Sequence, residues 1–307
     1  MKRFLTYCML LCLILLGILM LGEAVVRHYP NSYKLKSEFM DRNARQVRTL
    51  ILGNSHTYYG IDPKLIGSDA FNLANVSQRL EYDYFLLTKY YGQSVGNLKN
   101  VIVPVDFTGF FDGPLEGEDA ARVAYYKIYM GNRKYGWSKY CLELFHIQKF
   151  KDKMAPAFKY LFTGSYSLNC DSTGFGIPTT PPDQVTLESM RVSSDRVISH
   201  YPGMDVQNVA YNHCFLTKIG EFCKKRGIRL IVVSVPVWPE YYSRIGKKEL
   251  AVTRLEMQRM ERDYSAVCGD YMNDSRFTAI DNFSDASHLS QLGAERFTSV
   301  LKEDFAL

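Results

Sequence analysis

The stretch of sequence that decides the fold is IRLIVVSVP at residues 228–236. This run is almost entirely apolar and rich in β-branched residues, which is typical of a strand buried on both faces of a sheet. It follows directly on residues 206–226, whose apolar residues recur with helical spacing, and on Gly227, which predicts the end of that helix. A helix that leads straight into a buried strand indicates a sheet with helices packed on it.

The same alternation of strands and helices continues on both sides of this stretch. The other predicted elements are strands at residues 47–52, 71–74, 101–105 and 277–280 and helices at residues 80–91, 247–267 and 290–305. Apolar strands that alternate with amphipathic helices predict an α/β fold with a mainly parallel sheet covered on both faces. In such a sheet the reactive groups gather at the carboxyl ends of the strands, so we expect a site there.

The N-terminus has a composition of its own. Residues 4–21 are 18 consecutive uncharged residues, and Lys2 and Arg3 precede them. At ~1.5 Å per residue they span about 27 Å of a hydrocarbon core of ~30 Å. We expect residues 1–26 to be an uncleaved single-pass membrane anchor, with a cleaved signal peptide and a buried soluble helix as the alternatives. Lys2 and Arg3 favour a cytoplasmic N-terminus and therefore an extracytoplasmic C-terminal domain.

The charge and composition of the 307 residues limit the partners and the domain organisation of the chain. The net charge is only +5 and the longest basic run is the triplet at 224–226, which argues against nucleic acid as a partner. We predict a juxtamembrane linker at residues 27–46 and one domain at residues 47–307. That domain has an aromatic-rich insertion at about 107–204, which is either a lid over the substrate or a packing layer. The cysteines outside the anchor form no C-x-x-C pair, so we expect no metal site.

Two motifs carry side chains suited to nucleophilic catalysis. GNSHT at residues 53–57 follows a predicted strand, and a Ser at a strand-to-helix turn can expose both its hydroxyl and its own N–H. Ser55 is thus a candidate nucleophile, with capping of the next helix as its alternative role. In DASH at residues 285–288, the Asp285 carboxylate can reach the ring of His288, fix its tautomer and leave its other nitrogen as a base. The alternative is a surface Asp beside a His packed under a helix.

A third group of polar side chains follows the predicted strand at residues 71–74. Asn75 and Gln78 are three residues apart, so one face of a turn could present both amides to a developing oxyanion; helix capping is the alternative. Because the ends of parallel strands meet at one edge of a sheet, these amides can converge with Ser55 and with the DASH motif. The chain order Ser, Asp, His is compatible with a hydrolase.

Two blocks of the sequence resemble the SGNH/GDSL hydrolases. LILGNSH at residues 50–56 is similar to the first block of that family, and DASHL at residues 285–289 is similar to its closing D-x-x-H block. The resemblance implies a flavodoxin-like three-layer α/β/α sandwich with a mainly parallel sheet of about five strands. It also implies Ser55 as nucleophile, Asp285 as the orienting acid and His288 as the base.

The chain departs from that family pattern in two places. Asn54 stands where many members have Asp, and we group it with Asn75 and Gln78 as candidates for oxyanion or substrate contacts. The G-x-N-D block that normally supplies an oxyanion-hole Asn is absent. The corresponding strand ends at Asp106, whose carboxylate cannot donate a hydrogen bond unless it is protonated.

These expectations combine into one prediction of function. The chain looks most like alginate O-acetylation proteins and teichoic-acid D-alanyl transfer proteins. This implies a serine esterase or acyltransferase that acts on O-acyl esters, acetyl in particular, of a cell-surface glycan through an acyl-enzyme on Ser55. It would need no cofactor, and its partners would be the acylated glycan or another ester, the lipid bilayer and a membrane acyltransferase. The alternative is a catalytically weak SGNH-like protein that binds glycan or supports an acyltransferase assembly.

Overall fold

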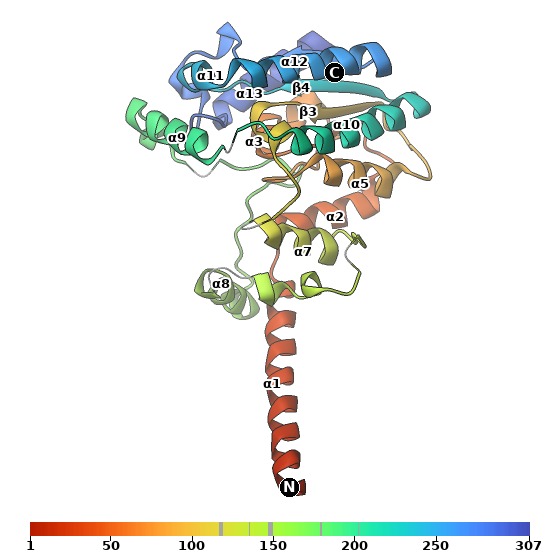
Figure 1. Ribbon diagram of the computed structural model, residues 1–307, viewed down its shortest axis with the longest axis vertical. Coiled ribbons are helices and arrows are strands. Elements are labelled where there is room, and N and C mark those ends of the chain that lie inside the picture. Colours follow the sequence, from red (N-terminus) through yellow and green to blue (C-terminus); the bar gives the residue numbers. More distant parts are fainter. Residues whose placement is uncertain (117–118, 135, 147–149, 179, 202) are drawn as a thin grey trace. The chain divides into compact units, whose positions relative to one another are not determined.

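The computed structural model describes the chain except residues 117–118, 135, 147–149, 179 and 202. Its contacts divide the chain into two units (Figure 1). Unit 1 consists of residues 1–37 and 115–168, and unit 2 consists of residues 38–114 and 169–307.

Unit 2 is built on a five-stranded sheet in which every neighbouring pair of strands is parallel. The strands are β1 (Thr49–Ile51), β2 (Ala70–Asn72), β3 (Asn100–Pro104), β4 (Arg229–Ser234) and β5 (Val267–Asp270). Their order across the sheet is β2-β1-β3-β4-β5, which is the flavodoxin-like order. The four strands β1 to β4 are buried almost throughout, as expected for a sheet with helices on both faces.

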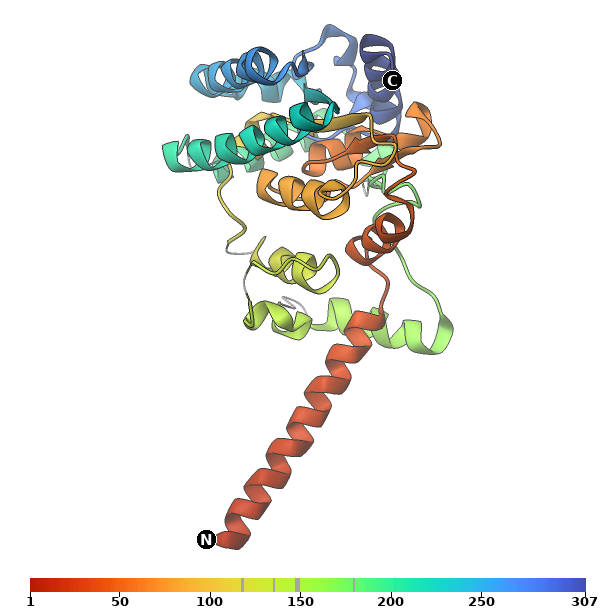
Figure 2. The ribbon, with the colours of Figure 1, turned by 90° about the vertical axis from the view of Figure 1, so that its right-hand side faces the viewer.

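Two layers of helices cover this sheet, and Figure 2 shows the sheet edge-on between them. One layer consists of α5 (Leu80–Tyr91), α10 (Val206–Arg226) and α12 (Lys247–Tyr264), and the other of α3 (Ser55–Gly60), α4 (Pro63–Ile66) and α13 (Gln291–Phe305). Helix α10 packs between α5 and α12, while α13 packs on α3 and α4. The predicted three-layer α/β/α sandwich with five parallel strands is confirmed.

The sequence prediction placed the fifth strand wrongly. Residues 277–280, predicted as a strand, lie instead in and between the short 3₁₀ helices η5 (Ser275–Phe277) and η6 (Ile280–Asn282). The fifth strand is β5, whose first residue we had included in the preceding helix. That helix ends earlier because Ser265, at its C-cap, adopts the left-handed conformation with φ 54°.

The remaining helices of unit 2 are short or peripheral. They are α6 (Phe107–Phe111), η4 (Pro182–Gln184), α9 (Leu187–His200) and α11 (Pro239–Arg244). Helix α2 (Ser32–Asn43) begins in unit 1 and ends in unit 2, and it occupies most of the segment that we predicted as a linker. The predicted domain boundaries stay predictions.

Unit 1 contains the N-terminal helix and most of the aromatic-rich insertion. Its elements are α1 (Lys2–His28), α7 (Ala120–Ile128), η2 (Lys139–Cys141), η3 (Glu143–His146) and α8 (Phe150–Thr163). Helix α1 is long and apolar enough to cross a membrane, and none of its most apolar window is buried within the structure. This observation fits the expected anchor in length and composition.

Candidate active site

The turn between β1 and α3 places Ser55 at the carboxyl end of the sheet. Gly53 has φ +114°, and a Cβ on this residue would lie 2.3 Å from Cδ of Pro104, so the turn requires glycine. The Asn54 side chain caps α3 by accepting a hydrogen bond from the His56 N–H at 3.0 Å. Ser55 is therefore the first residue of α3, and it remains partly exposed.

A narrow loop before α13 holds the other two predicted catalytic residues. Phe283 and Leu289, both buried, pair as an antiparallel bridge that closes the loop. Within it, Oδ1 of Asp285 accepts hydrogen bonds from the backbone N–H groups of Ser287 at 2.8 Å and His288 at 3.0 Å. These local bonds fix the directions in which the carboxylate and the imidazole point.

The structure brings Ser55, Asp285 and His288 together in the order that acyl transfer needs. Oγ of Ser55 lies 2.8 Å from Nε2 of His288, and Nδ1 of His288 lies 2.9 Å from Oδ2 of Asp285. Burial alone would raise the pKa of the Asp285 carboxyl, but the His288 ring and the Ser287 hydrogen bonds hold it well below its usual range. An ionised Asp285 accepts from Nδ1–H, which leaves Nε2 free to take the proton of Ser55.

The site lies where the strand order of the sheet reverses. β1 pairs with β2 on one side and with β3 on the other, so connections leave this point in opposite directions. A crevice at the carboxyl ends of the strands is expected at such a point, and it is the usual binding place in open α/β sheets. Ser55 follows β1 and Asp106 follows β3, so both flank this switch point.

A second histidine–aspartate pair lies beside the triad, and the sequence analysis missed it. Nδ1 of His56 is 2.9 Å from Oδ2 of Asp106, and both side chains are buried, at 3% and 1% exposure. Asp106 also accepts a hydrogen bond from the Gly109 N–H at 2.7 Å and one from the Asn54 amide at 3.3 Å. The rings of His56 and His288 meet edge to face at 5.3 Å. The available signal was that His56 and Asp106 follow adjacent strands.

Burial and charge act on this pair in opposite directions. Burial alone would lower the pKa of His56, but the Asp106 carboxylate raises it above its usual value. The charge and hydrogen bond of His56, together with the Gly109 and Asn54 donors, lower the pKa of Asp106 to about 2 despite its burial. The pair is therefore an ion pair inside the protein, joining the end of β1 to the end of β3.

The three residues proposed for oxyanion contacts all hydrogen-bond within this part of unit 2. The Asn54 amide donates to Asp106, the Asn75 amide donates to Oε1 of Gln78 at 3.4 Å, and the Gln78 amide donates to Oδ1 of Asp83 at 2.5 Å. Asn75 also donates its backbone N–H to the carbonyl of Gly53 at 3.1 Å. Their roles toward a substrate stay predictions.

Asp83 is a further buried residue that the sequence analysis did not single out. Its Oδ1 accepts the Gln78 amide and also the Gly53 N–H at 2.8 Å, so it supports the turn that carries Ser55. Burial raises the pKa of Asp83 to about 7, although these two hydrogen bonds oppose the shift. Its position on the inner side of α5 was visible from the helical spacing of Leu80, Tyr84 and Leu87, but its partners were not.

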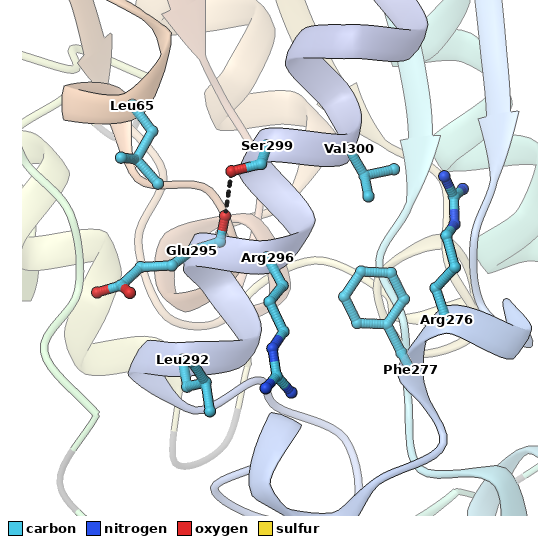
Figure 3. Close-up of a pocket in the computed structure, with 8 residues that line it drawn as sticks. All are labelled: Leu65, Arg276, Phe277, Leu292, Glu295, Arg296, Ser299 and Val300. Carbon is cyan, nitrogen blue, oxygen red and sulfur yellow. Dashed lines mark hydrogen bonds between the residues drawn. The ribbon is translucent and has the colours of Figure 1, made fainter.

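A surface pocket of unit 2 involves none of these residues (Figure 3). It is lined by Leu65, Arg276, Phe277, Leu292, Glu295, Arg296, Ser299 and Val300. Both arginines are already paired, Arg276 with Asp274 at 2.6 Å and Arg296 with Asp281 at 3.3 Å. Within the described ranges, no group of three or more His, Cys, Asp or Glu side chains is placed to hold a metal ion.

Comparison with known proteins gives distant structural likenesses. No family model and no curated protein matches the sequence. Among solved structures, a Streptococcus pneumonia protein described in terms of platelet activating factor has 11% identity and a TM-score of 0.44, over 96% of this chain and 98% of that one. A GDSL-like lipase from Bacteroides thetaiotaomicron has 10% identity and a TM-score of 0.42, over 90% of this chain and 100% of that one. A lipase/acylhydrolase from Enterococcus faecalis has 11% identity and a TM-score of 0.40, over 84% of this chain and 95% of that one. At these values the argument for chemistry rests on the side chains of the site.

Proposed function

We propose that this chain is a membrane-anchored serine esterase or O-acyltransferase with Ser55 as its nucleophile. The observation that carries the proposal is the 2.8 Å contact between Oγ of Ser55 and Nε2 of His288, which in turn is held by Asp285 at 2.9 Å. A nucleophile in hydrogen-bond reach of a base, with the base oriented by a third group, is the arrangement that acyl transfer requires.

The proposed reaction has two halves that share one intermediate. Oγ of Ser55 attacks the carbonyl carbon of the ester while Nε2 of His288 takes its proton, and Asp285 stabilises the resulting imidazolium. The tetrahedral adduct collapses, the alcohol leaves with the proton from His288, and the acyl group stays on Ser55. Water or a sugar hydroxyl then attacks the acyl-enzyme with His288 as base. The second tetrahedral adduct collapses to the acid or the new ester, and His288 returns the proton to Oγ of Ser55.

We assign the oxyanion contacts to the Ser55 backbone N–H and to the amides of Asn75 and Gln78. The Ser55 N–H lies at the first position of α3, where a helix leaves backbone donors without intrahelical partners. Asn75 bonds the Gly53 carbonyl through its backbone N–H, and Gln78 bonds Asp83, which accepts the Gly53 N–H. Both amides are therefore held against the turn that carries Ser55.

The proposed substrate follows from the membrane anchor and from the resemblance in the sequence. A domain fixed to a bilayer by α1, on the extracytoplasmic side, would meet the acylated polymers of the cell surface. We therefore propose O-acyl esters of a surface glycan, acetyl in particular, as the substrate and a membrane acyltransferase as a partner protein.

Labelling with a fluorophosphonate probe tests the nucleophile. We expect the full chain to be labelled once, at Ser55, and we expect Ser55→Ala to abolish labelling and to reduce turnover of an acetyl ester by about 10³-fold or more. Ser94→Ala is the matched control because Ser94 is exposed and its hydroxyl accepts a hydrogen bond from the nearby Gly96 N–H. A folded chain that is not labelled would favour the alternative of a glycan-binding or assembly protein.

A second measurement separates hydrolase from transferase. The chain is given a donor with a labelled acetyl ester, with and without a glycan acceptor, and the label is followed into acetate and into glycan. A transferase moves most of the label to the glycan when the acceptor is present, whereas an esterase releases acetate in both cases.

A further inference from the structure

The apolar stripe of helix α8 in unit 1 is longer than its buried part. Met154 and Ala157 belong to this stripe and are buried. Phe158, Leu161 and Phe162 continue it toward the C-terminal end of α8, because they follow Met154 by four, seven and eight residues. They are exposed, Phe162 at 86%. A surface helix of a water-soluble protein normally buries its apolar stripe against the core. We call Phe158, Leu161 and Phe162 the exposed stripe of α8.

The buried part of this stripe packs on the last turns of α1. Val25 and Val26 of α1 form a buried cluster with Met154 and Ala157 of α8. Figure 2 shows α8 running across the end of α1 rather than along it. Leu21 ends the exposed apolar stretch of α1, and Val25 lies four residues further, a rise of about 6 Å at ~1.5 Å per residue. If residues 4–21 span the hydrocarbon core, this distance places α8 in the headgroup region.

Hydrogen bonds fix the neighbouring segment at the same end of α1. The Glu23 carboxylate accepts the backbone N–H groups of Glu143 at 2.9 Å and Leu144 at 3.0 Å. Arg27 of α1 donates to the carbonyl of Cys141 at 2.5 Å, and Glu143 is held in turn by Lys153 of α8. The insertion is therefore attached to α1 by polar bonds as well as by apolar packing.

The composition of this segment fits a negatively charged membrane surface. Between residues 133 and 163 the chain has seven Lys or Arg and only two Asp or Glu. Trp137 is 98% exposed, and Phe145 is also exposed. Aromatic side chains at the level of the headgroups and basic side chains beside anionic lipids are the two recurring features of segments that lie in a membrane interface.

We propose that the exposed stripe of α8, together with Trp137, lies in the interfacial region of the bilayer, where the basic side chains of this segment bind anionic phospholipid headgroups. Unit 1 thereby acts as a membrane-bound base at the end of α1. This role differs from both a substrate lid and an internal packing layer. The proposal rests on the proposed anchoring by α1 but is independent of the ester chemistry proposed for Ser55.

The chain has only two tryptophans, which makes fluorescence a direct test. The full chain is placed in nanodiscs of zwitterionic lipid containing phosphatidylglycerol, with or without lipids brominated near the top of the acyl chain. In Trp238→Phe, the sole reporter is Trp137, and we expect bromolipid to quench its emission by about half. In Trp137→Phe the reporter is Trp238, which is buried in unit 2, and we expect no quenching.

Single tryptophans placed elsewhere, in a background lacking both native ones, complete the test. Phe162→Trp reports on α8 and should be quenched by bromolipid and protected from aqueous iodide. Leu255→Trp, at an exposed position of α12 in unit 2, should show the opposite behaviour. Leu11→Trp reports on α1 itself and should be quenched by lipids brominated deeper in the chain.

The outcomes separate the anchoring by α1 from the interfacial role of α8. If Leu11→Trp is quenched by lipid while Trp137 and Phe162→Trp are quenched by iodide alone, α1 spans the bilayer and the interfacial role of α8 is wrong. If Leu11→Trp is not quenched by lipid either, the anchor and the interfacial role both fail. Protection of Phe162→Trp from iodide without quenching by bromolipid would assign the exposed stripe of α8 to protein contact and would also overturn the proposal. Probe labelling of Ser55 is measured on the same samples and reports separately on the ester chemistry.

Discussion

At the scale of single residues, the site contains two histidine–aspartate pairs with different exposures. His288 and Asp285 are about a quarter exposed, as a pair that must meet a substrate has to be. His56 and Asp106 are buried, and their bonds extend to the Asn54 cap of α3 and to α6. The buried pair therefore holds the turn before Ser55, whereas the proposed mechanism assigns proton transfer to the exposed pair.

Removing the charge of Asp106 should destabilise unit 2, and more so at low pH. In the wild-type chain the pKa of His56 is raised, so its contribution to stability is complete below about 6.5 and is lost as the pH rises through the folded value. In Asp106→Asn the buried ring has no anion, its pKa falls, and stability declines as the pH drops below about 6.5. We expect a loss of about 3–5 kcal/mol at pH 5 and a smaller loss at pH 9.

Urea unfolding in detergent measures this effect. Trp238 emission in a Trp137→Phe background reports on unit 2 alone, because Trp238 is the one tryptophan left and is buried there. An equal loss of stability at both pH values would mean that His56 carries no charge in the folded chain.

Removing the charge of Asp83 should stabilise unit 2 at high pH, whereas removing that of Asp106 destabilises it. Its folded pKa of about 7 lies above the unfolded value, so the folded state binds the proton more tightly, and stability falls as the pH rises from about 4 to about 7. Asp83→Asn keeps an oxygen for the Gly53 and Gln78 donors but removes the buried charge. We expect about 2–4 kcal/mol more stability at pH 8 and little change at pH 4, by the same Trp238 measurement.

An exposed aspartate serves as the control for that variant. Asp263 lies on the surface beside Arg262, so Asp263→Asn removes only an exposed ion pair and should change the stability little at either pH. A less stable Asp83→Asn at pH 8 would show that the carboxylate is charged and needed in the folded state.

The sequence identified those site residues whose geometry is local or set by strand ends. Asp285 and His288 are three residues apart in one loop, and Ser55 follows a strand, so their types and positions were sufficient. His56 and Asp83 acquire their roles only from partners on other elements. His56 pairs with Asp106, 50 residues further along the chain, and Asp83 bonds Gly53, 30 residues before it. A pattern read along the chain contains no such pairing.

At the scale of elements, the turn between β1 and α3 has the tightest packing around the site. Gly53→Ala would put a Cβ 2.3 Å from Pro104 and 2.7 Å from Oγ1 of Thr57 in a backbone conformation with φ +114°. We expect a loss of about 2–4 kcal/mol in the stability of unit 2 and strongly reduced probe labelling of Ser55.

A second glycine separates backbone strain from crowding at the site. Gly227 also has positive φ, but a Cβ there meets nothing within 4 Å. Gly227→Ala should cost about 1 kcal/mol as a helix C-cap and leave the labelling of Ser55 intact. Equal labelling of both variants would show that the turn tolerates displacement.

The strands of the sheet were predictable to the degree that they are buried. β1, β3 and β4 are continuous apolar runs, and each was predicted within two residues at either end. β5 reads Val-Cys-Gly-Asp and has no buried residue, so it lacks the apolar run that marks a central strand. Residues 277–280 have that run, but Phe277 and its neighbours form 3₁₀ turns that pack beneath α13. Neither burial nor apolar content therefore marks the edge strand β5; its pairing with β4 does.

At the scale of the whole molecule, the residues of the candidate site and of the proposed membrane contact fall in different units. Ser55, Asp285 and His288 belong to unit 2, whereas α1 and α8 belong to unit 1. The chain passes between the units three times, after residues 37, 114 and 168. Substitutions on α8 should therefore change membrane contact without changing the labelling of Ser55.

The cysteines offer a test of orientation for the complete chain. All seven thiols are free, and Cys214 on α10 is exposed on unit 2. Burial raises the pKa of Cys223 and Cys268 to about 12, so both react slowly with maleimides, while Cys8 and Cys12 of α1 would lie in the bilayer.

Cells that express the chain, with any outer barrier to the reagent removed, are treated with a membrane-impermeant maleimide. If unit 2 is extracytoplasmic, Cys214 is labelled before lysis and Cys214→Ser loses most of the signal, because an exposed thiol reacts through its thiolate far faster than a buried one. Cys141→Ser is the background of choice, since Cys141 is only half-buried and would otherwise add to the signal. Labelling of Cys214 only after the cells are opened would place unit 2 in the cytoplasm and remove surface glycans from the proposed substrates, while leaving the chemistry of Ser55 to be judged by the probe.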